Sequence, residues 1–262
     1  ATNIIVILAL LYPFVLILSP VKQYLHILLK TLKASMRGYW WKILTIILLT
    51  YTFIAGFLIS VPDVGNLQQT IRNLFFHVPM CFAQLTLISV SLVYSILYLR
   101  KPGIRHDIYA SEFAKTGIVF GMLGLVTGMI WANYTWGAPW NNDPKQLGAA
   151  VALLIYLAYF VLRNSMTDID KRARVSAVYN IFAYFIYVPM IMVLPRMVES
   201  LHPGGKGVEG NPGFGGQDLD ATMRTVFWPA VIGWILLGVW ITTLRLRLQL
   251  LEEKKTHTSL AS

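Results

Sequence analysis

The sequence has little charge and almost no cysteine. Only 13% of its 262 residues are charged, about half of the roughly 25% found in soluble domains, whereas 56% are hydrophobic. This composition argues against a water-soluble protein. The single cysteine, Cys81, excludes a disulfide within the chain, and we expect it to be a small apolar packing residue. Neither a Cys-x-x-Cys-His motif nor a Gly-x-x-x-x-Gly-Lys-Ser/Thr phosphate loop occurs, so this chain is not itself a c-type cytochrome or an ATPase.

Long stretches without charged residues make up most of the sequence. Seven runs contain no charged side chain: 2–21, 43–62, 73–99, 116–142, 146–162, 175–195 and 225–244. A helix of about 20 apolar residues crosses the roughly 30 Å hydrocarbon core of a bilayer. The strands of a β-barrel would alternate in polarity, and these runs do not. The sequence therefore predicts an all-α polytopic membrane protein with six core transmembrane helices and an extra N-terminal hydrophobic helix at 2–21.

Three segments follow from the same pattern. Residues 1–38 combine the hydrophobic run with a stretch whose leucines share one helical face, which predicts an interfacial helix on the cytoplasmic surface. The stretch beside Ala1 has neither a charged n-region nor a cleavage site, so we predict no cleaved signal peptide. Residues 39–250 are expected to form the membrane domain, and 251–262 a cytoplasmic tail.

The basic residues are segregated along the chain. The net charge is +10. Of the 22 lysines and arginines, 17 fall within 22–42, 100–115, 163–174 and 245–255. The first three stretches are every second connection between the runs, and the fourth is the tail. The positive-inside rule assigns these connections to the cytoplasmic side. The charge is therefore explained by membrane topology. We expect lipid around the chain and no binding of nucleic acid.

Helix breakers add detail to the later runs. Gly124 and Gly128 have the small-xxx-small spacing that lets helices pack closely. Pro189 and Pro195 are expected to bend or end the sixth run. The glycine-rich stretch 203–216 cannot form a continuous helix.

Two histidines and three tryptophans gather on the opposite, external side: His77, His202, Trp131, Trp136 and Trp140. Each has an ordinary explanation alone, because tryptophan anchors helices at membrane interfaces and histidine caps loops. Together they indicate more, because indoles pack on a flat macrocycle and two neutral imidazoles can hold its iron from opposite sides. The combination is typical of a haem site.

Charged residues on this side are few. Haem carboxylates require cations, and the candidates here are Lys145, Arg72, Arg196 and Arg224. Asp143 is better suited to pair with a cation or an indole N–H than to contact haem.

One segment resembles a known signature. Residues Trp131 to Lys145 are similar to the tryptophan-rich WWD motif of haem-handling membrane proteins, which include the haem exporter protein C family (CcmC) and the related CcsA family. Arg72 with His77-Val78-Pro79 resembles the CcmC segment of the first external histidine, and Ser200-Leu201-His202 resembles that of the second. Met223-Arg224 resembles the start of the last span. The similarity covers about 39–250 and has the compact size of CcmC.

The resemblance implies a cytochrome c maturation protein of the bacterial inner membrane with a haem site on its periplasmic face. It implies His77 and His202 as axial ligands of non-covalent haem b, and Trp136, Trp140 and Asp143 as its platform. The haem would pass to a CcmE-like chaperone, beside the ABC-type subunits CcmA and CcmB and a small CcmD-like subunit. This role is binding and transfer, not enzymatic catalysis.

The match has departures, and two alternatives stay open. Asn142 stands where the family commonly has an aromatic residue, Pro144-Lys145 is closer to CcsA, and 2–21 has no counterpart in six-span CcmC. One alternative is a membrane electron-transfer subunit, which would normally bury histidine pairs within opposing helices. The other is a haem-free permease subunit whose tryptophans form an interfacial belt, in which replacing His77 or His202 would leave function intact.

Overall fold

The structure is a computed structural model that describes residues 38–63, 65, 67–204, 206 and 219–261. Six helices in this part of the chain are long and apolar enough to cross a membrane: Gly38–Leu58, Gln68–Arg100, Ile104–Trp136, Pro144–Asn164, Ile169–Met197 and Ala221–Lys255. The described residues contain no β-strand. The predicted all-α fold with six core helices is therefore confirmed. The helices predicted at 2–21 and 21–36 lie outside the described residues.

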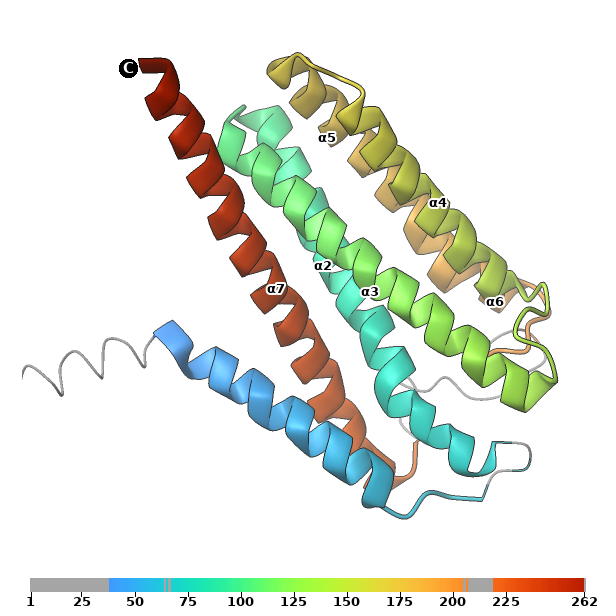
Figure 1. Cartoon of the computed structure of the whole chain (residues 1–262). Coiled ribbons are helices and arrows are strands. Elements are labelled where there is room, and N and C mark those ends of the chain that lie inside the picture. The colour runs from blue at the N-terminus through green and yellow to red at the C-terminus, as the bar shows by residue number, and fades with distance from the viewer. Residues whose placement is uncertain (1–37, 64, 66, 205, 207–218, 262) are drawn as a thin grey trace, which may run out of the picture. The chain divides into compact units, whose positions relative to one another are not determined.

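Residues 45–262 form one compact unit, to which the description below applies. After Gly38–Leu58, the elements are η1 (Gln68–Asn73), α2 (Leu74–Arg100), α3 (Ile104–Trp136), α4 (Pro144–Asn164), α5 (Ile169–Val188), η2 (Pro189–Val193), α6 (Leu194–Met197) and α7 (Ala221–Ala261) (Figure 1). Most of these helices extend beyond the charge-free runs. The α3 helix begins at Ile104, so Arg105 and Lys115 belong to it and not to a connection. At Pro189 the α5 helix gives way to the π-helical turn η2, and α6 then runs from Leu194 through Pro195 to Met197.

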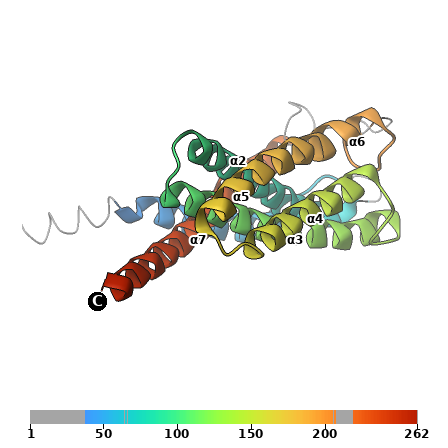
Figure 2. The same cartoon turned by 90° about the horizontal axis from the view of Figure 1, so that it is seen from above.

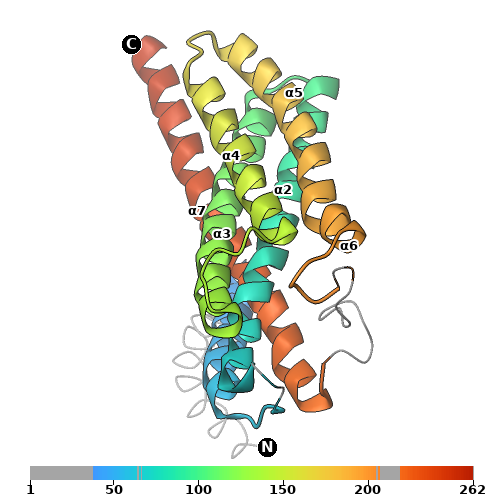
Figure 3. The ribbon, with the colours of Figure 1, turned by 90° about the vertical axis from the view of Figure 1, so that its right-hand side faces the viewer.

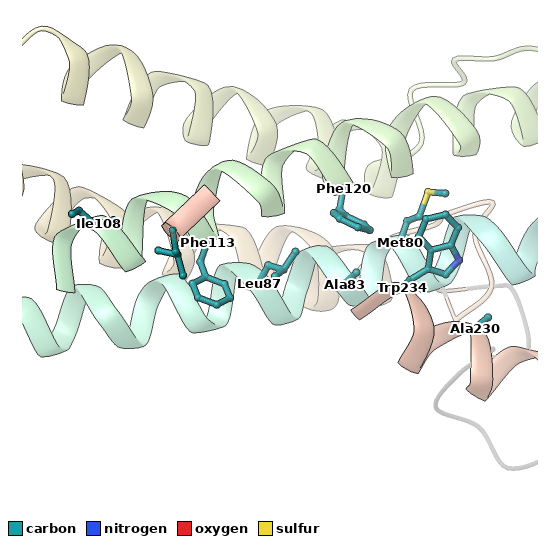
Figure 4. Packing of buried hydrophobic residues seen from close by; sticks show 9 residues of the cluster. Met80, Ala83, Leu87, Ile108, Phe113, Phe120, Ala230 and Trp234 are labelled. Carbon is teal, nitrogen blue, oxygen red and sulfur yellow. The ribbon is translucent and has the colours of Figure 1, made fainter. Parts of the chain in front are cut away.

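The α2 helix packs against α3, α5 and α7 (Figures 2 and 3). A buried cluster joins α2, α3 and α7, and its members include Met80, Leu87, Phe113, Phe120 and Trp234 (Figure 4). Glycines on α3 permit the close approach to α2. A Cβ on Gly124 would lie 3.2 Å from the Cys81 sulfur, and one on Gly128 would lie 2.7 Å from the His77 ring, both on α2. The close packing expected at these two glycines is thus observed.

The helix ends define two ends of the bundle. At the histidine end, η1 and α4 begin, α3 and α6 end, and α7 begins. At the basic end, α2 and α4 end and α3 and α5 begin. Buried carboxylates on α3 form ion pairs there. The Arg163 guanidinium on α4 donates two 2.6 Å hydrogen bonds to Asp107, and this pair is buried. The Glu112 carboxylate accepts from the partly exposed Lys115 of the same helix at 2.5 Å and from the exposed Arg245 of α7 at 2.6 Å. Such pairing is what allows charged groups inside a helix bundle.

Candidate functional site

The loop between α3 and α4 is built by its own sequence. Gly137 ends α3 in a left-handed conformation, with φ of 80°, which glycine adopts without strain. Asn142 has φ of 52°, a region in which asparagine is enriched and bulky residues are strained. Asp143 is the N-cap of α4, with Pro144 at its first position. The left-handed turn gives a physical reason for asparagine at the position where the CcmC pattern commonly has an aromatic residue.

Hydrogen bonds inside the loop fix its shape. The Trp140 indole N–H donates to the Asn142 side-chain oxygen at 2.8 Å. The Gln146 side chain accepts from the Asn141 backbone N–H at 2.9 Å and donates to the Pro139 carbonyl at 3.2 Å. The tryptophan-rich segment is therefore a shaped loop that holds Trp140 in place.

The Asp143 carboxylate is the centre of the site. It is buried and accepts four hydrogen bonds. One oxygen accepts from the His202 Nδ1 at 2.7 Å and from the Lys145 backbone N–H at 2.9 Å; the other accepts from the Ser200 hydroxyl at 2.8 Å and from the Leu201 backbone N–H at 2.7 Å. The carboxylate thus fastens the segment after α6 to the start of α4.

These contacts decide the protonation of the pair. Burial alone would raise the pKa of Asp143, but the hydrogen bonds from His202, Ser200 and Leu201 outweigh it and hold that pKa below its usual range. Burial lowers the pKa of His202; the charge of Lys145 acts in the same direction, and the bond to Asp143 opposes it. We therefore assign an ionised carboxylate and a neutral imidazole.

The orientation of His202 follows from its partner. A carboxylate only accepts hydrogen bonds, so Nδ1 carries the proton and Nε2 keeps its lone pair. The Trp136 indole meets the same ring edge-on, with the centroids 4.8 Å apart at 70°. Asp143 and Trp136 together present Nε2 of His202 to a ligand.

His77 on α2 is held in a parallel way from α3. The Thr127 hydroxyl donates to the Leu123 carbonyl at 2.8 Å, so it accepts from His77 Nδ1, 3.2 Å away. The Trp131 ring lies edge-on, with its centroid 6.0 Å from that of His77. Gly128 makes room for the imidazole, because a Cβ there would lie 2.7 Å from Cε1. With the proton on Nδ1, the lone pair of His77 is on Nε2.

Both imidazoles lie at the histidine end of the bundle. His77 lies near the start of α2, and His202 follows α6. Two neutral imidazoles are the axial donor set that haem iron accepts.

The predicted cations all lie at the histidine end, with defined partners. Arg72 donates to the Gly56 carbonyl at 3.0 Å and to the Gln69 side chain at 2.9 Å. Arg224 donates to the Leu219 carbonyl at 2.8 Å, and Arg196 donates to the Met192 carbonyl. Lys145 lies in the first turn of α4, two residues after Asp143.

Several residues that build the site were not predicted from the sequence. Ser200 and Leu201 complete the hydrogen bonds of Asp143, and Thr127 and Gly128 position His77. The run Asn142-Asp143-Pro144 carries a recognisable N-cap signature, which predicts the cap but not its second partner, His202.

The sequence matches a known family over most of its length. The model of the family Heme exporter protein C (CcmC) matches residues 28–261. Heme exporter protein C of Escherichia coli K12 is 25% identical over 217 residues, which cover 82% of this chain and 85% of that protein. The protein of the same name from Bradyrhizobium diazoefficiens is 26% identical over 195 residues, covering 74% of this chain and 72% of its own length. This multi-pass membrane chain therefore belongs to the heme exporter protein C family.

Proposed function

We propose that this chain holds non-covalent haem b between His77 and His202 at the histidine end of the bundle and delivers it to a CcmE-like haem chaperone. Family membership supports a role in haem handling for cytochrome c maturation. The observation that carries the finer proposal is the Asp143–His202 hydrogen bond of 2.7 Å, which leaves Nε2 of a neutral imidazole for iron. This is a binding and transfer role, in which no covalent bond of the cargo is made or broken.

Each residue has a distinct task in this proposal. Haem supplies an iron with two axial positions, and the two histidines fill them. Trp136 and Trp140 offer indole faces to the macrocycle, while Trp131 packs beside His77. Asp143 acts on His202 and does not touch the cargo, which makes it a positioning residue.

The cations would bind the haem propionates. Lys145 is one candidate, because it lies in the first turn of α4 beside the Asp143 cap. Arg72, Arg196 and Arg224 lie at the same end and offer guanidinium groups suited to carboxylates.

The placement of His202 suits handover. It follows α6 in a non-helical segment and is held by hydrogen bonds to Asp143 and Ser200. Breaking those few contacts releases this ligand, whereas His77 is fixed on α2. By the positive-inside rule the histidine end faces the periplasm across the bacterial inner membrane, where the chaperone and the CcmA, CcmB and CcmD-like subunits would be met.

The test is the absorption spectrum of detergent-purified protein, oxidised and reduced, for the wild type, His77→Ala and His202→Ala. We expect a bis-histidine haem spectrum that both substitutions alter or abolish. His106→Ala is the matched control, because His106 is a half-buried histidine at the basic end, where its Nδ1 meets the Lys101 carbonyl at 3.0 Å. A wild type that stays haem-free with its partners and ample haem would overturn the proposal and favour the permease alternative.

A further inference from the structure

One face of α5 is polar inside the membrane-spanning bundle. Arg172, Ser176 and Asn180 follow one another at four-residue steps, so they lie above one another on that face. Ser176 is 1% exposed and Asn180 is fully buried. Polar side chains at such depth are costly in a membrane protein and indicate a use.

Asn180 is only half satisfied. Its Nδ2 donates at 2.8 Å to the hydroxyls of Ser91 and Ser95 on α2. The Ser91 hydroxyl gives its own hydrogen to the Ala110 carbonyl at 2.6 Å, so it can only accept from Asn180. This fixes the orientation of the amide. Its oxygen, Oδ1, is buried and has no hydrogen-bond partner among the described residues.

Ser176 repeats the pattern one turn closer to the basic end. Hydroxyls inside helices usually donate to the carbonyl four residues earlier, as Thr86, Thr116 and Thr242 do here. The Ser176 hydroxyl makes no such bond, and its buried oxygen has no partner in the described part of the chain.

Arg172, one further turn along, opens to the outside. Its Nε is buried without a partner among residues the structure describes, while the residue as a whole lines a pocket of about 200 Å³ at the basic end. Asp107, Glu112 and Arg163 line the same pocket, so it is polar and charged. Three buried polar atoms without a partner among the described residues therefore follow one another along α5, starting at the residue that lines this pocket: Arg172 Nε, Ser176 Oγ and Asn180 Oδ1.

We propose that water enters from this pocket and is bound in a file along α5, at Arg172, Ser176 and Asn180. Buried polar atoms in folded proteins nearly always find a partner, and an ordered water is the partner when no side chain serves. The pocket is large enough for several waters, each of which needs on the order of 10–15 Å³ of such space. The inference concerns the basic end and does not depend on haem binding.

The file is an inlet and not a channel. The next residue at the same spacing, Tyr184, has its hydroxyl 3.0 Å from the Ser89 hydroxyl, so it is satisfied without water. Ala183 beside it packs in an apolar cluster with Ile88 and Tyr156. The file of unsatisfied atoms along α5 therefore ends at Asn180. The buried Tyr156 hydroxyl, which also has no partner among the described residues, lies on α4 and outside this file.

Reactivity of introduced cysteines tests the inlet, because thiols react as hydrated thiolates. The variants Ser176→Cys and Asn180→Cys are made in a Cys81→Ser background. They are compared with Ala177→Cys and Ala183→Cys, because these two alanines also lie on α5 but are buried in hydrophobic clusters. Ag⁺ is added to sealed vesicles in which the basic end of the bundle faces the outside solution. Thiols that Ag⁺ has blocked are then counted by the loss of maleimide labelling after unfolding.

We expect Ag⁺ to block Ser176→Cys at least tenfold faster than Ala177→Cys, and Asn180→Cys faster than Ala183→Cys. We also expect little blocking from the histidine end. Equal rates at Ser176→Cys and Ala177→Cys would overturn the proposal, as would equal blocking from both ends. Serine and cysteine differ by one atom, so Ser176→Cys decides the question even if Asn180→Cys does not fold; monodisperse elution confirms folding.

Discussion

Replacing Asp143 by asparagine tests whether this carboxylate orients the second histidine. The carboxylate accepts from four donors: His202 Nδ1, the Ser200 hydroxyl, and the backbone N–H groups of Lys145 and Leu201. Asparagine has the same shape but only one acceptor oxygen, and its NH₂ group donates. In the variant, the two donors that bind one of the carboxylate oxygens must therefore face the NH₂ group, which is itself a donor. Both pairs include a backbone N–H, which cannot reverse its role.

The two orientations of the amide have different costs. With the oxygen toward His202, the cap of α4 survives, because asparagine caps as well as aspartate, but the Leu201 N–H is left unpaired at a cost of about 1–3 kcal/mol. With the NH₂ toward His202, Nδ1 must accept, and the ring proton moves to Nε2, where it blocks iron. Partners of metal-binding histidines typically contribute 10–100-fold to affinity, which corresponds to about 1.4–2.7 kcal/mol.

We therefore expect Asp143→Asn to weaken haem binding by about 10–100-fold. The assay is the rate of haem transfer to an excess of a haem-scavenging protein, followed by absorbance. Asp220→Asn is the matched control, because the exposed Asp220 also accepts from a backbone N–H at the start of a helix, that of Thr222 at 2.8 Å, but holds no histidine. A transfer rate for Asp143→Asn within twofold of both wild type and control would refute the positioning role.

Two further substitutions test the packing. Gly128→Ala should displace His77, because a Cβ there would lie 2.7 Å from its ring. It should shift the haem spectrum more than Gly124→Ala does, because a Cβ on Gly124 would meet only the Cys81 sulfur, at 3.2 Å. Equal spectra for the two variants would contradict the assignment of His77 as a haem ligand. Arg163→Gln leaves a buried carboxylate on α3 without its partner and should cost about 3–5 kcal/mol, seen as a lower thermal-unfolding midpoint in detergent. Lys115→Gln, which removes a partly exposed ion pair, should cost at most about 1 kcal/mol, and similar midpoints for these two variants would speak against the buried pair.

Local sequence was enough to predict the membrane fold and to suggest candidate residues for the site. Whether a run of residues spans a bilayer depends on its own length and composition, so six of the runs gave six helices. The shape of the loop after α3 is equally local, since Gly137, Asn142 and Asp143 each suit the backbone conformation they occupy. His77, His202 and the tryptophans were candidates because their side chains suit haem, and their roles stay predictions.

The tertiary structure decided which side chains meet. The partners of the two histidines are remote in sequence: Asp143 is 59 residues from His202, and Thr127 is 50 residues from His77. The ion pair between Asp107 on α3 and Arg163 on α4 likewise joins residues 56 apart in the sequence. Local composition sets the free energy of placing a helix in the membrane, whereas hydrogen bonds and ion pairs between helices depend on which faces pack together.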